Sequence, residues 1–290
     1  MSKAAQFRKL IKEVPFLIMP GVYDCLTAKI VENNGFPAIW LGDGTISVSV
    51  LGQPDFGILS VPEIIGRARD ICNAVKIPAI VDIATGGGGP INVQGAVRAV
   101  EALDAAGVFF EDQQWPKKCG HIEGRKLIPL EEMVSKVRAA VDVRNDPDFL
   151  IVARTDARRS EGLDGALERL HAYHNAGADI GFIDALESME DLEQAANKLQ
   201  FPLMVNMLEG GKTPYLSAHE LEKLGYKIGL WPETLLYAGF RAMMNVAREL
   251  KETGTVSAES RISMADFVEL SEFLGLRQLY ALEKRYAVVS

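Results

Sequence analysis

The segment WPKKCGH at residues 115–121 places two lysines, a cysteine and a histidine within five consecutive positions. It follows an apolar run that ends in Phe-Phe-Glu-Asp, as a loop after a buried strand would. Neighbouring cations stabilise the thiolate of Cys119, and a thiol tuned in this way exchanges protons near neutral pH. The segment therefore predicts a proton-transfer site at Cys119, with Lys117 and His121 beside it. An incidental thiol on a basic loop is the alternative.

Polar side chains also end most of the other apolar runs. Asp82 and Glu111 end two of them, and carboxylates gathered at one place are the ligands that Mg²⁺ prefers, with Mn²⁺ as a second choice. Arg154 ends a third run, and its planar guanidinium binds a carboxylate or phosphate through two hydrogen bonds. Each acidic residue alone could equally cap a helix, but together these groups predict a small, anionic, oxygen-rich substrate.

Eight short apolar runs alternate with helical patterns along the chain and must position these groups. Runs that are apolar throughout are typical of buried parallel strands, and eight of them predict a (β/α)8 TIM barrel within one α/β domain over residues 1–290. A doubly wound open sheet is the main alternative. In such a barrel the active site lies at the carboxyl ends of the strands, where the polar groups stand. The predicted strands are 16–21, 38–43, 78–84, 107–112, 149–155, 180–184, 202–207 and 227–232.

The chain from about residue 233 to 290 adds further helical patterns, which predict an extension used in oligomerisation. The apolar positions within residues 264–287 exceed what a helix exposes to water, so we expect them to pack on a second subunit. A helical cap on the same chain is the alternative.

Composition limits the class of partner. The chain carries 31 basic and 39 acidic residues, a net charge of −8, without a basic run, so a nucleic-acid partner is not expected. No apolar run approaches the roughly 18 residues of a membrane span, and the first residues lack the pattern of a signal peptide. These features predict a cytoplasmic protein without a membrane partner, and the three scattered cysteines predict reduced thiols.

Four motifs, in order, resemble the isocitrate lyase and phosphoenolpyruvate mutase superfamily in its short-chain branch. They are LGQPDFG (51–57), EDQQWPKKCGH (111–121), LIVARTDAR (150–158) and VNMLEGGKTP (205–214). That branch contains methylisocitrate lyase, dimethylmalate lyase, oxaloacetate hydrolase and carboxyphosphoenolpyruvate phosphonomutase. The resemblance, from about residue 7 to 287, implies a barrel whose last helix is exchanged between subunits, in a homotetramer built as a dimer of helix-swapped dimers.

The resemblance also implies roles for single residues. It assigns Asp55, Asp82 and Glu111 to the shell of a Mg²⁺ ion, and it makes the segment around Cys119 a gating loop. Cys119 is then the general acid, and the other catalytic candidates are Lys117, Glu111, His121 and Arg154. The candidates for substrate binding are Tyr23, Trp40, Gly42, Asp43, Gly44, Gly120, Asp184, Asn206, Glu209 and Trp231.

Three positions depart from the pattern of that superfamily. Ala84 stands where a second aspartate normally serves the metal, so affinity for a hard cation should fall. Asp43 stands in a stretch that normally carries serine and glycines, and we predict that it offsets the missing carboxylate as a further candidate metal ligand. A helix cap turned outward is the alternative for Asp43. Asp184 replaces a more common glutamate, which indicates altered substrate specificity.

The main hypothesis is a Mg²⁺-dependent lyase that cleaves a carbon–carbon bond of a 2-hydroxy di- or tricarboxylic acid, of methylisocitrate or 2-alkylmalate type. The products are an α-keto acid and a carboxylate, and Cys119 protonates the carbon of the departing enediolate while Mg²⁺ and Arg154 hold the keto-acid portion. One alternative is a phosphonate enzyme, of carboxyphosphoenolpyruvate mutase or phosphonopyruvate type, and an oxaloacetate-type hydrolase is close to it. The other is a diverged barrel that binds a metabolite with an altered metal site.

Overall fold

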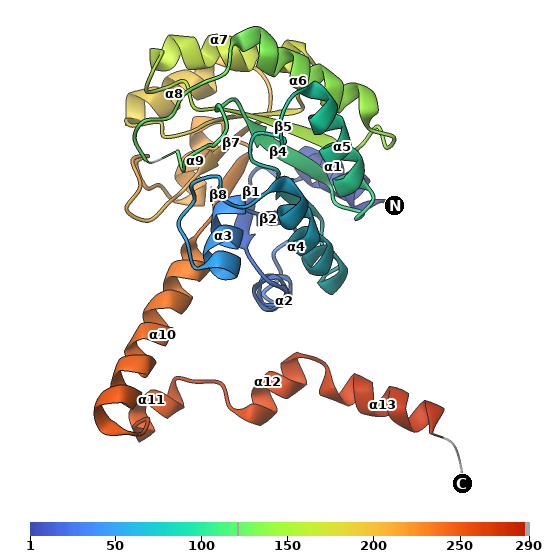
Figure 1. Cartoon of the computed structure of the whole chain (residues 1–290), viewed down its shortest axis with the longest axis vertical. Coiled ribbons are helices and arrows are strands. Elements are labelled where there is room, and N and C mark those ends of the chain that lie inside the picture. The colour runs from blue at the N-terminus through green and yellow to red at the C-terminus, as the bar shows by residue number, and fades with distance from the viewer. Residues whose placement is uncertain (121, 288–290) are drawn as a thin grey trace. The chain divides into compact units, whose positions relative to one another are not determined.

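The computed structural model of the chain describes residues 1–120 and 122–287. These residues fall into two units, which divide between Leu236 and Tyr237. Figure 1 shows the first unit as a ring of strands surrounded by helices and the second as a series of helices.

The first unit is a closed barrel of eight parallel strands in chain order. Pairing of the first and last strands, with Leu17 opposite Ile228, closes the ring. All eight predicted strands are present, so the predicted (β/α)8 barrel is confirmed and the open sheet is wrong. The strands are β1 (Leu17–Val22), β2 (Ile39–Leu41), β3 (Ala79–Asp82), β4 (Gly107–Glu111), β5 (Leu150–Thr155), β6 (Ile180–Ile183), β7 (Leu203–Asn206) and β8 (Ile228–Trp231).

Helices connect the strands and cover the outside of the barrel (Figure 1). Several begin at capping boxes written in the sequence, such as the pair Ser60 and Glu63. The second strand is shorter than predicted, because the chain turns at Gly42 and Asp43 becomes the first residue of a helix. The helices of this unit are α1 (Lys3–Glu13), α2 (Cys25–Asn33), α3 (Asp43–Leu51), α4 (Val61–Ala74), α5 (Pro90–Glu101), α6 (Leu130–Val143), α7 (Gly162–Asn175), α8 (Met189–Lys198) and α9 (Ala218–Leu224).

The core of the barrel unit has two parts, because successive side chains of a strand face opposite sides. Phe109 points into the barrel, where its ring meets those of Trp40 and Phe182 edge to face at centroid distances of 6.0 and 5.3 Å. Phe110, the next residue, packs in the larger cluster outside the strands. Phe7 of α1 joins the inner cluster. The interior is therefore filled, and only the strand ends are available for chemistry.

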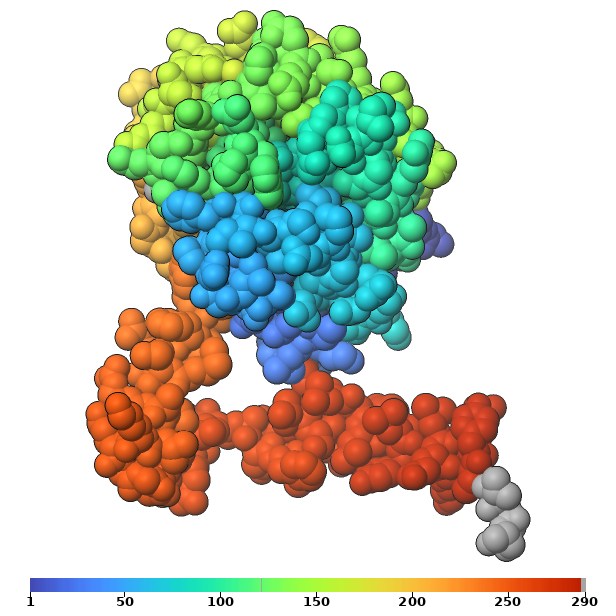
Figure 2. Space-filling model, in the orientation of Figure 1, coloured from blue at the N-terminus to red at the C-terminus, as the bar shows by residue number. Residues whose placement is uncertain are grey.

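The second unit has no core of its own. It contains most of α10 (Thr234–Thr253), together with α11 (Ala258–Ile262), α12 (Phe267–Phe273) and α13 (Leu276–Tyr286), and none of its described residues is buried. Figure 2 shows its atoms, coloured orange to red, as an extended run. Large apolar side chains are exposed along it, among them Met243 at 63% and Phe267 at 82%. None of the helices in the described part of the chain combines the length and apolar character of a membrane span.

Candidate active site

The carboxyl ends of the strands and the loops that follow them enclose a cavity of about 50 Å³. Thr45, Leu208, Pro232 and Glu233, which the sequence did not single out as site residues, also line it. They are chain neighbours of predicted residues, which is the only sequence signal for them. The predicted site residues that line the cavity are Trp40, Asp43, Gly44, Asp55, Asp82, Cys119, Gly120, Arg154, Asp184 and Asn206.

A larger hollow of about 640 Å³ lies elsewhere on the barrel unit, between α4, α5 and the glycines 86–88. Its described lining is mainly apolar or glycine and includes none of the predicted catalytic residues. We therefore take the small cavity at the strand ends as the site of chemistry, although the other hollow is larger.

The loop between β4 and α6 carries Cys119 and Gly120 to the cavity and places Lys117 behind cavity residues. The amide of Gln113 fixes the loop internally, since it accepts a hydrogen bond from the backbone N–H of Lys118 at 3.0 Å and donates one to its carbonyl at 2.8 Å. The backbone N–H of Cys119 donates to the carbonyl of Asp55 at 3.2 Å. The loop thus lies against the segment after α3, and the side chain of Cys119 is half-buried. His121, a predicted catalytic residue, lies outside the described residues.

Gly120 is the point at which this loop presses on the strand ends. A Cβ atom added there would lie 1.6 Å from a carboxylate oxygen of Asp184 and 2.5 Å from Nη2 of Arg154. Any larger residue would therefore push the loop away from both side chains. Gly42 has a similar role beside Trp40, because a Cβ atom there would lie 2.1 Å from the indole ring.

Arg154 of β5 is held in place by carboxylates at the ends of its own strand and of the two neighbouring strands. Its Nε and Nη2 donate to the two carboxylate oxygens of Asp156 at 2.9 and 2.8 Å, and it pairs with Glu111 at 3.2 Å and Asp184 at 3.4 Å. Arg125 of the loop also binds Asp156, at 2.7 Å. Burial alone would raise the pKa of Asp156, but the attraction of Arg154 and then Arg125 outweighs it and holds that pKa below its usual range. The arginine is thus fixed at the cavity wall by an ionised partner.

Behind Arg154 lies a polar network that sequence patterns did not predict. The buried carboxylate of Asp112 accepts hydrogen bonds from the hydroxyls of Thr155 and Tyr173, each at 2.7 Å, and from Arg169 at 3.3 Å. It also accepts the backbone N–H of Asp156 at 2.9 Å. Arg169 and Tyr173 stand four positions apart on α7, so they lie on the same face of that helix. This spacing is the only feature of the sequence that could have indicated the network. The network fixes the residue that holds Arg154.

Lys117 lies in a second charged cluster, on the other side of the mouth. Only 2% of the residue is exposed, and its Nζ lies 2.5 Å from Asp43 and 2.7 Å from Asp55. Burial lowers the pKa of Lys117, but the attraction of Asp43, Glu111, Asp55 and Asp82 holds it well above its usual value. The ammonium therefore stays charged. It faces carboxylates, and Asp43 is buried beside it, so the alternative of an outward-turned helix cap at Asp43 is wrong.

The carboxyls around Lys117 hold their protons more tightly than usual. Burial raises the pKa of Asp55 to about 6, with repulsion from Asp43 adding to the effect and Lys117 opposing it. Burial likewise raises the pKa of Glu111 to about 8 against the attraction of Arg154 and Lys117. Asp82, fully buried, has a pKa raised well above its usual value, chiefly by burial and then by Asp43. The cluster contains more negative charge than Lys117 alone neutralises.

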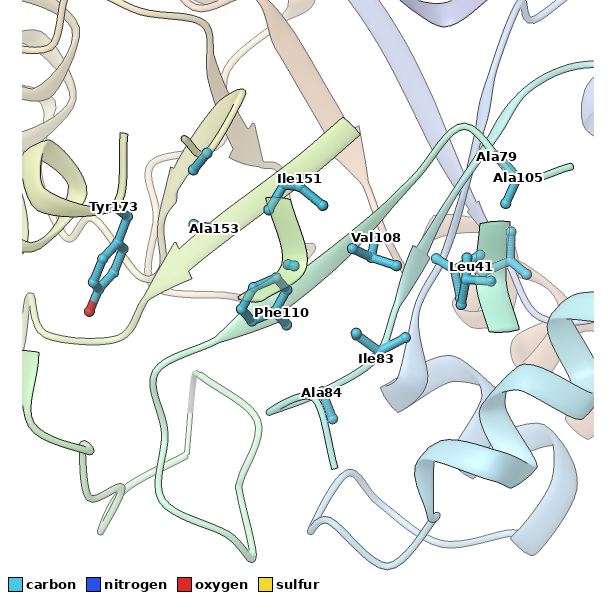
Figure 3. Packing of buried hydrophobic residues seen from close by; sticks show 14 of the residues in the cluster. Leu41, Ala79, Ile83, Ala84, Ala105, Val108, Phe110, Ile151, Ala153 and Tyr173 are labelled. Carbon is cyan, nitrogen blue, oxygen red and sulfur yellow. The ribbon is translucent and has the colours of Figure 1, made fainter. Parts of the chain in front are cut away.

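The side chains present do not fit the predicted Mg²⁺ shell. Ala84 is 1% exposed and belongs to the apolar cluster outside the strands, and Figure 3 shows it beside Ile83 just beyond β3. One oxygen of Asp82 accepts the backbone N–H of Ala84 at 2.8 Å, and Asp55 is bound to Lys117. Within the described residues, no group of three acidic, histidine or cysteine side chains could hold a metal ion. The missing second aspartate therefore has no carboxylate in its place.

The remaining candidates lie beside the cavity and do not line it. Trp231 donates from its indole to the hydroxyl of Tyr215 at 3.1 Å, and that hydroxyl donates to Glu209 at 3.2 Å. Thr234 donates to the same carboxylate at 2.5 Å. Tyr23 is half-buried before α2. Lys117 and Glu111 also stand outside the cavity lining, and each contacts residues that line it.

The fold and the polar mouth are those of a barrel enzyme. Over residues 7–251 the chain matches the family described as phosphoenolpyruvate phosphomutase, and it belongs to that family. The predicted superfamily is thereby confirmed.

Similar proteins within this family carry different names. The chain is 42% identical to 2,3-dimethylmalate lyase of Eubacterium barkeri over 99% of each chain. It is 41% identical to a chloroplastic carboxyvinyl-carboxyphosphonate phosphorylmutase of Arabidopsis thaliana, over 97% of this chain and 84% of that one. Among solved structures, oxaloacetate acetylhydrolase with the inhibitor 3,3-difluorooxalacetate superposes with a TM-score of 0.92, at 32% identity, over 98% and 97% of the two chains. All three relatives are enzymes, and the hypothesis of a carbon–carbon lyase agrees with the first.

Proposed function

We propose that this protein is a carbon–carbon lyase that cleaves a 2-hydroxy di- or tricarboxylate of 2-alkylmalate or methylisocitrate type. One observation carries the proposal: Arg154 and Cys119 line the same cavity, Arg154 from a strand and Cys119 from a loop. Arg154 is permanently charged and binds a carboxylate through its planar fork, whereas a thiol can deliver a proton. A retro-aldol cleavage requires both functions at the same place.

The proposed reaction moves one proton away from the substrate and returns one to it. A carboxylate of the mouth, with Asp55 as the candidate among those that line the cavity, accepts the proton of the 2-hydroxyl group. The bond between the hydroxyl-bearing carbon and its neighbour then breaks, which leaves an α-keto acid and a carboxylate enediolate. The Cys119 thiol protonates the enediolate carbon, and the proton from the hydroxyl group restores the thiol.

Cationic groups balance the charge that develops during this cleavage. Arg154 would hold the carboxylate of the keto-acid portion, with Asp184, Gly120, Asn206 and Trp40 shaping the cavity around it. The superfamily resemblance predicts Mg²⁺ as a further cation, held by Asp82, Asp55 and Glu111. Since Asp55 is bound to Lys117 and Ala84 offers no ligand, no step of the proposal depends on that ion.

The gating role of the loop is part of the proposal. Pockets for small molecules usually enclose about 300–1,000 Å³, whereas the cavity here is about 50 Å³. A 2-hydroxy dicarboxylate therefore enters only when the segment with Cys119 and Gly120 moves away from Asp184. Closure afterwards would exclude water from the enediolate.

The test is turnover of a panel of substrates: 2,3-dimethylmalate, methylisocitrate, oxaloacetate and phosphonopyruvate. Release of an α-keto acid from a 2-hydroxy acid is expected, with a carboxylate as the second product. Turnover of phosphonopyruvate alone would favour a phosphonate enzyme, which the phosphorylmutase relative keeps as the second candidate. Binding without turnover of any member would support the diverged metabolite-binding barrel.

The assembly and location of the protein belong to the same proposal. We infer that residues from about 233 to 290 extend a single barrel domain and pack on other copies, in a cytoplasmic homotetramer whose last barrel helix is exchanged. Support comes from the exposed apolar side chains of the second unit, such as Phe240 and Leu279, which find no cover within that unit. Light scattering at micromolar concentration should give a tetramer, and a monomer would contradict the inference.

A further inference from the structure

The position of Lys117 explains two departures from the superfamily pattern together. One carboxylate is missing at Ala84, beyond β3, and one is gained at Asp43, at the start of α3. The gained carboxylate does not join a group of metal ligands. It lies 2.5 Å from the ammonium of Lys117, which also lies 2.7 Å from Asp55. The carboxylate of Asp43 thus binds the ammonium of Lys117, a cation that the chain itself supplies.

We propose that the Lys117 ammonium, clamped between Asp43 and Asp55, takes the place of the divalent cation, so that this protein binds and turns over its substrate without Mg²⁺. The catalytic half of the inference rests on the proposed lyase function, and the cation-binding half does not. Lys117 is thereby assigned as the internal counter-ion of the carboxylates that would otherwise surround a metal.

Three observations support this assignment. First, Lys117 is buried, so its charge acts at short range with little screening by water. Second, an ammonium has three N–H donors and two carboxylates face it, so both carboxylates hold its positive charge in place. Third, Asp43 and Asp55, the two carboxylates that Lys117 contacts, also line the cavity, so the ammonium compensates negative charge at the site itself.

The geometry also disfavours a divalent ion at this position. Mg²⁺ requires six oxygen ligands at about 2.0–2.1 Å in near-octahedral order. Here the oxygen of Asp55 that faces the centre already accepts a hydrogen bond from Lys117, and a cation at the same place would be repelled by the ammonium. A divalent ion would have to displace Lys117 and draw Asp43 and Asp55 toward itself.

The experiment is a Mn²⁺ titration of the full chain, first freed of metals with a chelator, followed by electron paramagnetic resonance. The wild type is expected to bind Mn²⁺ no better than surface carboxylates do. Lys117→Met removes the ammonium and leaves Asp43 and Asp55 without their counter-ion, so its Mn²⁺ affinity should rise at least about tenfold. Lys117→Arg keeps the cation and should bind as weakly as the wild type.

Lys118→Met is the matched control, because the neighbouring ammonium lies 5.8 Å from the centre of the Phe56 ring and does not touch these aspartates. It should leave Mn²⁺ binding unchanged. Tight, stoichiometric binding of Mn²⁺ by the wild type, equal to that of Lys117→Met, would overturn the inference. If Lys117→Met does not fold, the wild-type titration decides alone. A wild type that rejects Mn²⁺ yet turns over no member of the substrate panel would refute the lyase function and leave the cation assignment intact.

Discussion

The two sides of the barrel mouth each hold a buried cation between carboxylates, Arg154 on one side and Lys117 on the other. The two cations lie on different kinds of structural element. Arg154 extends from β5, and its partners Glu111, Asp156 and Asp184 lie at or just after the ends of adjacent strands. Lys117 extends from the loop after β4 and reaches Asp43 and Asp55, on and after α3. The first cation is fixed by the sheet, whereas the second lies on the loop. If the loop closes as proposed, closure would bring a positive charge to the site along with Cys119.

Because of this difference, substitutions on the two sides should have different effects. A strand-borne pair keeps its distance as long as the barrel is intact. A loop-borne pair depends on contacts such as the 3.2 Å hydrogen bond from the N–H of Cys119 to Asp55. Variants on the Arg154 side should therefore affect substrate binding most, and variants on the Lys117 side should affect the closed state of the loop.

The largest effect is expected from Cys119→Ser, because a hydroxyl group is a much weaker acid than a thiol. Turnover should fall by about 10²- to 10⁴-fold, while the melting temperature stays the same, since a half-buried loop thiol contributes little packing. Steady-state kinetics with thermal unfolding measures both. Cys25→Ser, on α2 away from the cavity, is the control and should keep full turnover. Normal turnover of Cys119→Ser would remove the thiol from the mechanism.

Arg154→Gln should lower kcat/KM by about 10³-fold, because it removes the charge that holds the substrate and leaves Asp156 and Asp184 with less positive charge. Most of the loss should appear in KM. The control is Arg158→Gln, whose side chain pairs with Asp191 at 2.8 Å, away from the cavity. Equal losses in the two arginine variants would mean that Arg154 acts only through stability.

Asp43→Asn should have a smaller effect, because Lys117 keeps Asp55 as a partner. We expect kcat to fall about tenfold, which corresponds to about 1.4 kcal/mol in the barrier, without recovery on addition of Mg²⁺. Recovery with Mg²⁺ would show instead that Asp43 is a ligand of a metal shell. Activity measured across a Mg²⁺ series in wild type and variant distinguishes these outcomes.

The smallest expected effect is a difference in pH dependence of stability between the two sides. The pKa of Asp55 is raised to about 6 in the folded state, so its contribution to stability is complete below pH about 4 and is lost as the pH rises through about 6. The pKa of Asp156 is held below its usual range, so its contribution is present above pH about 4 and is lost as the pH falls.

Urea unfolding between pH 4 and 7 tests this contrast. Relative to Asp55→Asn, the wild type should lose stability as the pH rises, and relative to Asp156→Asn it should gain stability over the lower part of that range. Slopes of the same sign in the two comparisons would contradict the opposite environments described for the two carboxyls.

The sequence predicted the strand-borne side of the site well, for a physical reason. Buried parallel strands are continuous apolar runs, and their carboxyl ends meet at one face, so Asp82, Glu111 and Arg154 could be placed together from their positions alone. Asp43 was placed at a strand end because Ile-Trp-Leu runs into Gly-Asp without a break, whereas the chain turns at Gly42 and begins α3.

The loop-borne contacts could not be predicted from patterns. Lys117 meets Asp55, which is 62 positions away along the chain, and Arg125 meets Asp156, 31 positions away. Neither pair lies on a common strand or helix, so no periodicity relates its members. The distances depend on the conformation of the loop, which its composition does not determine.

A lyase that uses its own cationic side chains in place of Mg²⁺ should work without added metal, and one measurement tests this most directly. The wild-type protein, freed of metals and kept in excess chelator, is mixed with 2,3-dimethylmalate and methylisocitrate, and the α-keto acid released is measured over time with and without added Mg²⁺. At least one of these substrates should release its α-keto acid, at the same rate under both conditions. Release that occurs only after Mg²⁺ is added would contradict a lyase that relies on its own cationic side chains.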